Sequence, residues 1–369
     1  MVDPPPQNVP ALTQLYVYVT DSCNCACIHC WIYAGAATAG GNGGNFLKPD
    51  VLEAAIVEAK PLGLQALKWT GGEPTIHPDF PALLVIQKRH GLQGRLETNG
   101  MRITAELAAQ LADSGVDQVS VSLDGARPET HDSIRGVRGA WDRAVAGFGH
   151  LVTRGYRPQI IMSLMRRNVT ELEDVLKLAA QMGAGSVKFN IVQPNLRGEE
   201  IHAAGEAIPV AELIELNRWV EREVAPRFSF PIYFDVPLAF RSLTRILANG
   251  SSTCGIKTIL GLLADGSYAL CGIGVNVPEL VFGRAGYEQL DDVWRNHAVL
   301  RRIRESVPDR LEGVCGQCLM KTACLGACIA QNYHDSGDLK ADYWFCRDAV
   351  AKGLFPTSRL FQDSKGRAK

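Results

Sequence analysis

The sequence of 369 residues lacks the features of several protein classes. It has no excess of either charge, because 38 Lys and Arg stand against 39 Asp and Glu, so nothing indicates a basic surface for nucleic acid or anionic lipid. Its start, MVDPPPQNVP, lacks the basic and apolar regions of a signal peptide. No apolar run is long enough to span a bilayer. We therefore expect a cytoplasmic protein without nucleic-acid or membrane partners.

Cysteine is absent from residues 31–253 but abundant on both sides of that gap. Of the 11 cysteines, four lie within residues 23–30 and seven within residues 254–346. An odd number of cysteines in a reducing compartment argues against a disulfide framework and favours metal ligands or reactive thiols. Scattered buried cysteines would not gather in this way.

The first two thirds of the sequence alternate between short β-rich runs and helical patterns. Strands are predicted at 15–20, 66–70, 94–98, 118–123, 159–165 and 186–192. Helices are predicted at 49–60, 79–90, 104–114, 140–153, 170–182 and 209–224. Alternating β and α units predict a parallel sheet with right-handed crossovers. Six units fall short of the eight in a complete barrel, so the pattern fits a partial barrel or a doubly wound sheet.

Every unusual short motif of this region follows a predicted strand. The cysteine-rich segment 21–30 follows the first strand, and GGEP (71–74) follows the second. Asn99 and Asp124 come at the ends of the third and fourth strands. In α/β folds of either kind, chemistry collects at the carboxyl ends of the strands. We therefore expect these motifs to share one site.

After about residue 240 the regular alternation stops, and turn-rich pieces with seven cysteines follow. ADGSYALC (264–271) predicts a hairpin whose turn is Asp265-Gly266. A segment this dense in cysteine indicates a small domain held together by metal. The predicted organisation is a disordered arm at 1–14, a barrel at 15–240, a cysteine-rich domain at 241–350 and a tail at 351–369.

Cys23, Cys27 and Cys30 form the spacing CxxxCxxC. Three thiolates on one loop can hold three irons of a 4Fe–4S cluster and leave the fourth iron open. A structural zinc ion would instead take four ligands, with Cys25 as the fourth. The spacing alone leaves both alternatives open.

CxxxCxxC after the first strand, followed by GGEP after the second, resembles the radical S-adenosylmethionine (radical SAM) superfamily. The resemblance implies a partial (β/α)6 barrel of the TIM type and a 4Fe–4S cluster held by the three spaced cysteines, with Cys25 outside the ligand set. It also implies that SAM chelates the open iron and that its amino group contacts Gly71, Gly72, Glu73 and Pro74. Glycine permits close backbone approach, and a carboxylate accepts from an ammonium group.

The same resemblance implies further SAM contacts at His29, Asn99, Ser122, Asp124, Arg135 and Asn190. His29 stands where the family has an aromatic residue against adenine, and Asn190 lies where relatives line the adenine pocket. Ser122 and Asp124 match positions near the ribose and carboxylate, and Arg135 matches an arginine that pairs with the carboxylate. Each of these residues also fits an ordinary cap, turn or surface charge.

The later cysteines resemble the SPASM extension of radical SAM enzymes, which carries two auxiliary 4Fe–4S clusters. The resemblance implies that one cluster is ligated completely by Cys315, Cys318, Cys324 and Cys346. It implies that the other is held by Cys254, Cys271 and Cys328. Where relatives with eight cysteines place another ligand, this sequence has Ile259-Leu260-Gly261, so the fourth ligand is not identified.

The resemblance implies an oxidoreductase that forms a 5′-deoxyadenosyl radical and abstracts hydrogen from its substrate. SPASM members mostly modify ribosomally made peptides, and KFNIVQP and CGIGVNVPELVFG are similar to maturases of the SynChlorMet-cassette type. Gly272 replaces the acidic residue that serves as base in sulfatase-maturing relatives, so that role is disfavoured and no catalytic acid or base is assigned. Implied partners are a precursor peptide and an electron donor such as flavodoxin or ferredoxin, and the leader of the peptide is expected to be held by the barrel, the SPASM domain or a separate leader-binding protein.

Two other functions stay open at this point. One is a radical SAM enzyme that acts on a small molecule, such as a tetrapyrrole or a quinone-cofactor precursor. The other is a zinc-binding scaffold without enzymatic activity.

Overall fold

The computed structural model describes residues 9–32, 44–249 and 254–361. All of its strands belong to one sheet. The order of its ten strands is β10-β9-β8-β1-β2-β3-β4-β5-β6-β7. The strands of the barrel are β1 (Gln14–Tyr18), β2 (Ala66–Thr70), β3 (Gln93–Thr98), β4 (Val116–Ser122), β5 (Gln159–Leu164), β6 (Ser186–Ile191) and β7 (Ile232–Phe234). Neighbours from β1 to β7 are parallel. The predicted partial barrel is confirmed, and β7 is a strand that the sequence analysis missed.

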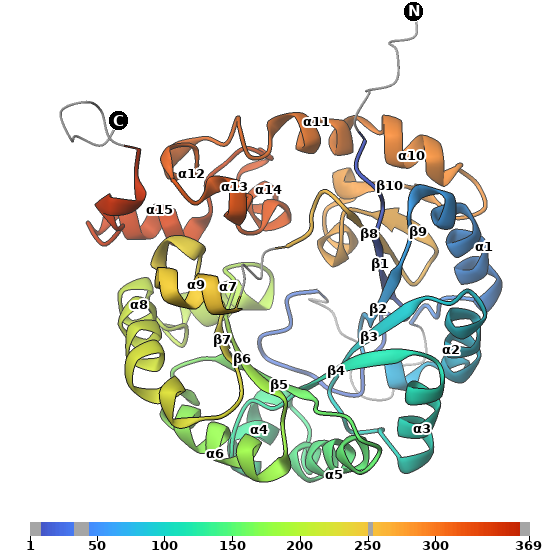
Figure 1. Cartoon of the computed structure of the whole chain (residues 1–369), viewed down its shortest axis with the longest axis horizontal. Helices are drawn as coiled ribbons and strands as arrows, with labels where there is room; N and C mark the ends of the chain where they lie inside the picture. The colour runs from blue at the N-terminus through green and yellow to red at the C-terminus, as the bar shows by residue number, and fades with distance from the viewer. Residues whose placement is uncertain (1–8, 33–43, 250–253, 362–369) are drawn as a thin grey trace, which may run out of the picture.

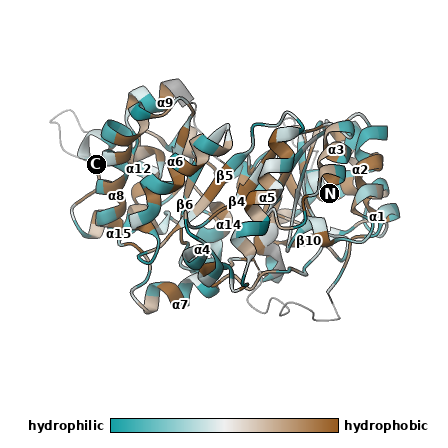
Figure 2. Cartoon of the chain, turned by 90° about the horizontal axis from the view of Figure 1, so that it is seen from below, coloured by the Kyte–Doolittle hydropathy of each residue, from teal (hydrophilic) through white to brown (hydrophobic). Residues whose placement is uncertain are grey.

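Helices lie outside the curved sheet, as Figure 1 shows. They are α1 (Pro49–Ala59), α2 (Phe80–Arg89), α3 (Ala105–Asp113), α4 (Pro128–Arg135), α5 (Ala140–Thr153), α6 (Leu172–Met182), α7 (Arg197–Ala203), α8 (Val210–Trp219) and α9 (Leu243–Asn249). All six predicted helices are present, whereas α4, α7 and α9 were not expected; α4 and α7 lie at one end of the barrel (Figure 2). Within the described segments, no helix is long and apolar enough to cross a membrane.

Helix α6 shows why these segments fold as they do. Its buried residues Leu172, Val175, Leu176 and Ala179 recur with helical spacing and face the sheet. The helix ends at Gly183, whose φ of +77° is the left-handed conformation that glycine adopts without a steric penalty. Teal and brown alternate along the surrounding helices in Figure 2, as expected of elements with one apolar face.

The strands alternate as well, which is unusual for a parallel sheet. In β6, Val187, Phe189 and Ile191 are buried in the hydrophobic core, while Lys188 and Asn190 line a cavity on the other face. Parallel sheets that are covered on both faces normally read as continuous apolar runs. The inner face of this barrel is therefore polar and surrounds open space rather than a packed core.

The cysteine-rich region continues the barrel sheet instead of forming a separate core. Its strands are β8 (Ile259–Leu262), β9 (Ser267–Ala269) and β10 (Val281–Arg284). β8 pairs in parallel with β1 and antiparallel with β9, and the predicted turn contains Gly266 with φ of +91°. Its helices are α10 (Leu290–Asn296), α11 (Ala298–Ser306), α12 (Gly313–Gln317), α13 (Lys321–Cys324), α14 (Ile329–Ser336) and α15 (Trp344–Ala351). In Figure 1 these helices complete the ring on the side that the barrel strands leave open.

The structure corrects both predicted chain ends where it describes them. Residues 9–14 were assigned to a disordered arm, but Leu12 is fully buried and its N–H donates to the carbonyl of Leu62. Residues up to 361 of the predicted tail are also packed, because Phe355 is buried and Arg359 donates to the carbonyl of Arg241. Apolar side chains within these segments find partners on the barrel. Residues 1–8 and 362–369 lie outside the described part of the chain.

Candidate active site

The loop after β1 carries the first cysteines and is held by two helices that follow other strands. The N–H groups of Ala26 and Ile28 donate to the carbonyls of Arg135 and Ile134 at the end of α4. Arg197 of α7 donates to the carbonyl of Cys27 at 2.8 Å. The two unpredicted helices therefore fix the backbone on which Cys23, Cys27 and Cys30 are spaced.

Cys25 lies among the expected ligands rather than apart from them. Its buried thiol donates to Sδ of Met101 at 3.4 Å and accepts from Asn99 at 3.5 Å, and its backbone N–H donates to Sγ of Cys23 at 3.4 Å. Its exclusion from the ligand set stays a prediction that rests on the motif.

The two glycines of GGEP pack directly against the backbone that leads from β1 into the cysteine loop, and this close approach leaves no space for a side chain. The N–H groups of Gly72 and Glu73 donate to the carbonyls of Thr20 and Ser22 at 2.8 and 2.9 Å. A Cβ atom on Gly72 would lie 1.9 Å from the Ser22 oxygen, and Gly71 has a φ of +124°. A side chain at either position would push the cysteine loop away, so GGEP and the cysteine motif are one structural unit.

The Glu73 carboxylate is 1% exposed and is surrounded by donors. Its Oε1 accepts from both the N–H and the hydroxyl of Thr75 and from the hydroxyl of Thr98, and its Oε2 accepts from the N–H of Asn99 at 2.7 Å. Burial raises the pKa of Glu73 in spite of these bonds. Among the described residues, no Lys, Arg or His forms an ion pair with it. Oε2 retains acceptor capacity for a cation such as an ammonium group.

Asp124, Arg135 and His29 meet beside the cysteine loop. Arg135 forms an ion pair with the fully buried Asp124 at 2.8 Å, and His29 approaches the same carboxylate at 3.8 Å. Burial would raise the pKa of Asp124, but the Arg135 guanidinium and the neighbouring imidazoles lower it overall. Arg135 also donates to Sγ of Cys27 at 3.5 Å, while its buried Nε has no acceptor. The Arg135 guanidinium thus pairs with the carboxylate of Asp124, and its Nε–H is left to donate to a further anion.

The other expected SAM contacts differ in how well the structure places them. Asn99 donates to Oδ1 of Asn24 at 2.6 Å and so ties the end of β3 to the cysteine loop. Asn190 lines the same central cavity as His29 and has a buried Oδ1 without a partner. Ser122 is half-buried at the end of β4. Asn99 thus contacts the cysteine loop, and Asn190 and His29 line the central cavity, whereas Ser122 has no such contact among the described residues.

A central cavity of about 600 Å³ extends from the cysteine loop to the later cysteines. His29 and Trp31 line one part, and Cys254, Cys324 and Cys328 line another. Charged and polar side chains from the inner face of the sheet line the space between them: Tyr16, Lys68, Arg95, Glu97, Lys188 and Asp235. The sequence analysis did not identify this lining, although polar residues at alternate positions of a parallel strand were a signal for it.

Cys254, Cys271 and Cys328 lie close enough to act on one another electrostatically, and burial raises the pKa of all three thiols. A Cβ atom on Gly261 would lie 3.2 Å from Cα of Cys271, so a glycine at this point of β8 lets Cys271 pack against the strand. At position 272, a Cβ atom would lie 2.5 Å from the Tyr18 ring. This leaves no room for an acidic side chain at 272.

The other four cysteines enclose a separate, smaller space. Cys315, Cys318, Cys324 and Cys346 all line one small pocket, together with apolar residues such as Phe355. The thiols of Cys315 and Cys346 share a hydrogen bond, which lowers the pKa of Cys315 and raises that of Cys346. Four soft sulfur donors around one apolar space fit an iron–sulfur cluster.

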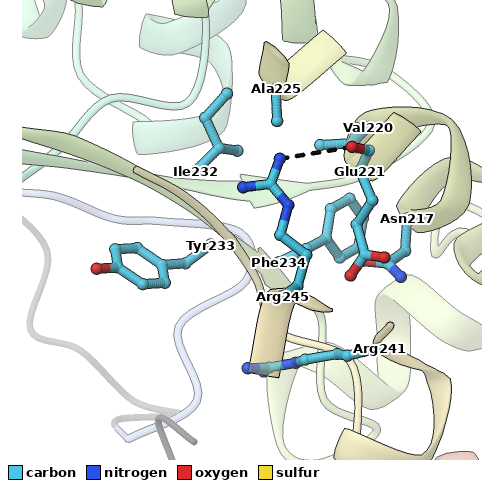
Figure 3. A pocket seen from close by; sticks show the side chains of 9 residues that line it. All are labelled: Asn217, Val220, Glu221, Ala225, Ile232, Tyr233, Phe234, Arg241 and Arg245. Carbon is cyan, nitrogen blue, oxygen red and sulfur yellow. Dashed lines mark hydrogen bonds between the residues drawn. The ribbon is translucent and has the colours of Figure 1, made fainter. Parts of the chain in front are cut away.

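A neighbouring pocket between β7, α8 and α9 has different chemistry (Figure 3). It is lined by nine residues, among them Tyr233, Arg241 and Arg245, and Arg245 donates to the carbonyl of Glu221. None of these nine residues is a cysteine or an expected SAM contact, so this pocket does not belong to the candidate site.

A sequence model of the Radical SAM superfamily matches residues 17–179, which include the cysteine loop and GGEP. These residues resemble the Radical SAM superfamily, and the relatives described below are enzymes that cover most of the chain. The chain is therefore an enzyme, and the alternative of a zinc-binding scaffold without activity is wrong. The match implies a 4Fe–4S cluster and SAM. Three thiolates on one loop beside a buried carboxylate without a cation fit these two groups.

Curated relatives cover most of the chain. The AdoMet-dependent heme synthase of Methanosarcina barkeri is 28% identical over 349 residues, which are 89% of this chain and 94% of the relative. The mycofactocin maturase MftC of Mycobacterium tuberculosis is 29% identical and covers 85% of this chain and 78% of its own length. The PqqA peptide cyclase of Ruegeria pomeroyi is 26% identical, with coverages of 90% and 87%.

Among solved structures, SuiB of Streptococcus suis bound to its precursor peptide SuiA has a TM-score of 0.69 at 17% identity. The match covers 92% of this chain and 76% of SuiB. At this identity the likeness concerns the fold, and it extends through the SPASM-type region.

Proposed function

We propose that this enzyme abstracts hydrogen from a ribosomally made peptide held in the central cavity and thereby modifies or crosslinks it oxidatively. The observation that carries the proposal is the cavity itself, which joins the SAM-binding loop to the cysteines of the later region. Its volume of about 600 Å³ and its partly charged lining suit a peptide segment with polar groups. The PqqA peptide cyclase and the SuiB complex with a precursor peptide support this substrate class.

In this proposal the first cluster is held by Cys23, Cys27 and Cys30. When bound and reduced, the cluster and SAM supply a 5′-deoxyadenosyl radical that takes a hydrogen atom from the substrate. Glu73 accepts the SAM ammonium on Oε2, and Arg135 offers its Nε–H to the SAM carboxylate. His29 and Asn190 contact the adenine, and the barrel wall keeps bulk water away from the substrate radical.

The later cysteines hold two auxiliary clusters in this proposal. Cys315, Cys318, Cys324 and Cys346 ligate one of them completely. Cys254, Cys271 and Cys328 would hold the other, and two of these ligands, Cys254 and Cys328, also line the central cavity. After hydrogen abstraction, the substrate radical is oxidised by one electron and loses a proton, and these thiols position the electron acceptor next to it.

The partners follow from this chemistry. An external one-electron donor such as flavodoxin or ferredoxin is needed to start each reaction. A precursor peptide is the substrate, and its leader is held by the barrel, by the cysteine-rich region or by a separate protein.

A tetrapyrrole precursor is the second candidate substrate, favoured by the 28% identity to a heme synthase over nearly its whole length. The cavity lining suits either substrate, because it combines the cations Lys68, Arg95 and Lys188 with apolar side chains such as Trp31, Ile191 and Leu238. The peptide is preferred because a maturase and a peptide cyclase are among the relatives.

The test is to incubate reduced enzyme with SAM and, in parallel, with peptides encoded by neighbouring genes and with iron coproporphyrin. The proposal expects one peptide to lose hydrogen atoms, seen as a decrease in mass of about 2 Da or a small multiple. Conversion of the porphyrin with all peptides unchanged would contradict it.

A further inference from the structure

Lys68 of β2 is a charged residue inside the barrel that the proposed chemistry does not yet use. Its Nζ lies 2.7 Å from Oε1 of Glu97 on β3 and 4.7 Å from the centre of the Tyr16 ring on β1. A carboxylate on one side and an aromatic face on the other restrict a side chain that is otherwise flexible. The ammonium is therefore held at a defined place in the lumen.

The strand register places Cys271 in the same row as Lys68. Gly261 of β8 pairs with Tyr16 of β1, and Tyr16 pairs with Lys68 of β2. Residues paired in this way project from the same face of the sheet. At Gly261 the place of a side chain is taken by the backbone of Cys271, at 3.2 Å from a Cβ atom. Cys271 thus occupies the side-chain position of Gly261 on β8, which is two strands away from Lys68 on β2 and at the same level of the sheet, with Tyr16 of β1 between them.

The ion pair has its positive end nearer to the cysteines of this site. The strand order β8-β1-β2-β3 places Lys68 on β2 one strand closer than Glu97 on β3 to β8, against which Cys271 packs. Lys68, Glu97 and Cys254 also line the same cavity. The two charges therefore act on the site in opposite senses, and the ammonium is the nearer of the two.

We propose that Lys68, positioned by Glu97 and Tyr16, raises the reduction potential of the auxiliary cluster at Cys254, Cys271 and Cys328. The inference rests on the cluster assignment in the proposed function. Reduction adds one negative charge to a group that is already surrounded by thiolates, so a fixed cation beside it favours the reduced form. Lys68 would thereby make this site a better acceptor for the electron that leaves the substrate radical. It is a positioning residue and not a catalytic one.

The test uses the full chain with Cys23, Cys27 and Cys30 replaced by Ala, reconstituted with iron and sulfide so that only auxiliary clusters form. The potentials of the two clusters are measured by titration with dithionite, followed by electron paramagnetic resonance. In Lys68→Met, the reduction potential of one cluster is expected to fall by about 59 mV, which is a tenfold change of the one-electron reduction equilibrium towards the oxidised form. The other signal is the internal reference and stays unchanged.

Three further variants make the result specific. Lys68→Arg keeps the charge and is expected to stay within about twofold of the parent equilibrium. Glu97→Gln removes the compensating carboxylate and is expected to shift the same signal in the opposite direction. The control is Lys177→Met, which breaks an exposed Lys–Asp pair on α6 and is expected to shift neither signal.

Equal potentials in Lys68→Met and Lys177→Met would overturn the inference. If Lys68→Met loses its iron, Glu97→Gln decides, because an unchanged potential in that variant overturns the inference and a raised one supports it. A parent protein with about four auxiliary irons instead of about eight would contradict the cluster assignment itself. Failure of the proposed function is thus distinguished from failure of the role of Lys68.

Discussion

The two ends of the central cavity use the same ligands in different surroundings. At the first end, Cys23, Cys27 and Cys30 lie on one loop, next to the buried carboxylates of Glu73 and Asp124. At the second end, Cys254, Cys271 and Cys328 come from three separate segments, and Lys68 lines the same cavity as Cys254 and Cys328. Acceptor groups suit the cationic end of a cofactor, whereas a lysine suits an electron acceptor. This difference agrees with the proposed function, in which the first end binds SAM and the second end receives the substrate's electron.

Removing a cysteine from each end gives the largest expected contrast. Cys27→Ala should abolish 5′-deoxyadenosine formation, because the SAM-binding cluster is lost. Cys271→Ala should keep 5′-deoxyadenosine formation but yield no modified peptide, because the electron has no acceptor. Both products are measured by liquid chromatography with mass spectrometry after anaerobic reconstitution.

Cys25→Ala is the matched control for the first end and should still form 5′-deoxyadenosine. If it is as inactive as Cys27→Ala, the ligand assignment of the first loop is wrong. If Cys271→Ala also fails to cleave SAM, the two ends are not functionally separate.

The same small substitution, Gly to Ala, should affect the two ends unequally. At Gly72 the added methyl would lie 1.9 Å from a backbone oxygen, so the cysteine loop must move and most SAM cleavage should be lost. At Gly261 the contact with Cys271 is 3.2 Å, so a small shift accommodates it at a cost of about 1–3 kcal/mol in the free energy of unfolding. SAM cleavage is measured for the first variant and thermal unfolding for the second.

Gly149→Ala is the control for both, since no atom lies within 4 Å of the added methyl. It should match the parent in both measurements or be slightly more stable. Full SAM cleavage by Gly72→Ala would show that GGEP and the cysteine loop are not one unit.

Glu73→Gln should have a smaller effect that is confined to the first end. Loss of a charge-assisted hydrogen bond costs about 1.5–3 kcal/mol, which weakens SAM binding by roughly ten- to a hundredfold. Binding is measured by equilibrium dialysis, and iron content should stay at the parent level.

Thr75→Val distinguishes the charge of Glu73 from its internal hydrogen bonds, because it removes one donor to the carboxylate but leaves the charge. It should bind SAM far better than Glu73→Gln does. Unchanged SAM affinity in Glu73→Gln would refute the role of the carboxylate.

The first end was largely predictable from sequence, since its motifs are contiguous and follow strands with clear patterns. Thr98, Asn99 and Glu73 are on neighbouring strand ends, so a parallel sheet brings them together. The pairing of Arg135 with Asp124 was not predicted, because it depends on α4, a short polar helix without an apolar pattern.

The second end was predicted only as a set of cysteines. Its position beside Lys68 depends on the pairing of β8 with β1, which are separated by more than 240 residues and leave no local signal. The ion pair of Lys68 with Glu97 likewise depends on how two strands curve around the lumen. Local sequence patterns do not predict which short strands pair when they are far apart in the chain.

The most direct test of the different roles of the two ends is electron paramagnetic resonance on two proteins. The intact protein should contain three clusters and about twelve irons per chain. In the variant without Cys23, Cys27 and Cys30, one of two auxiliary signals should change when a peptide that the intact enzyme modifies is added. Identical spectra with and without that peptide would contradict a substrate-facing second end, and fewer than about eight irons in the intact protein would contradict the three clusters.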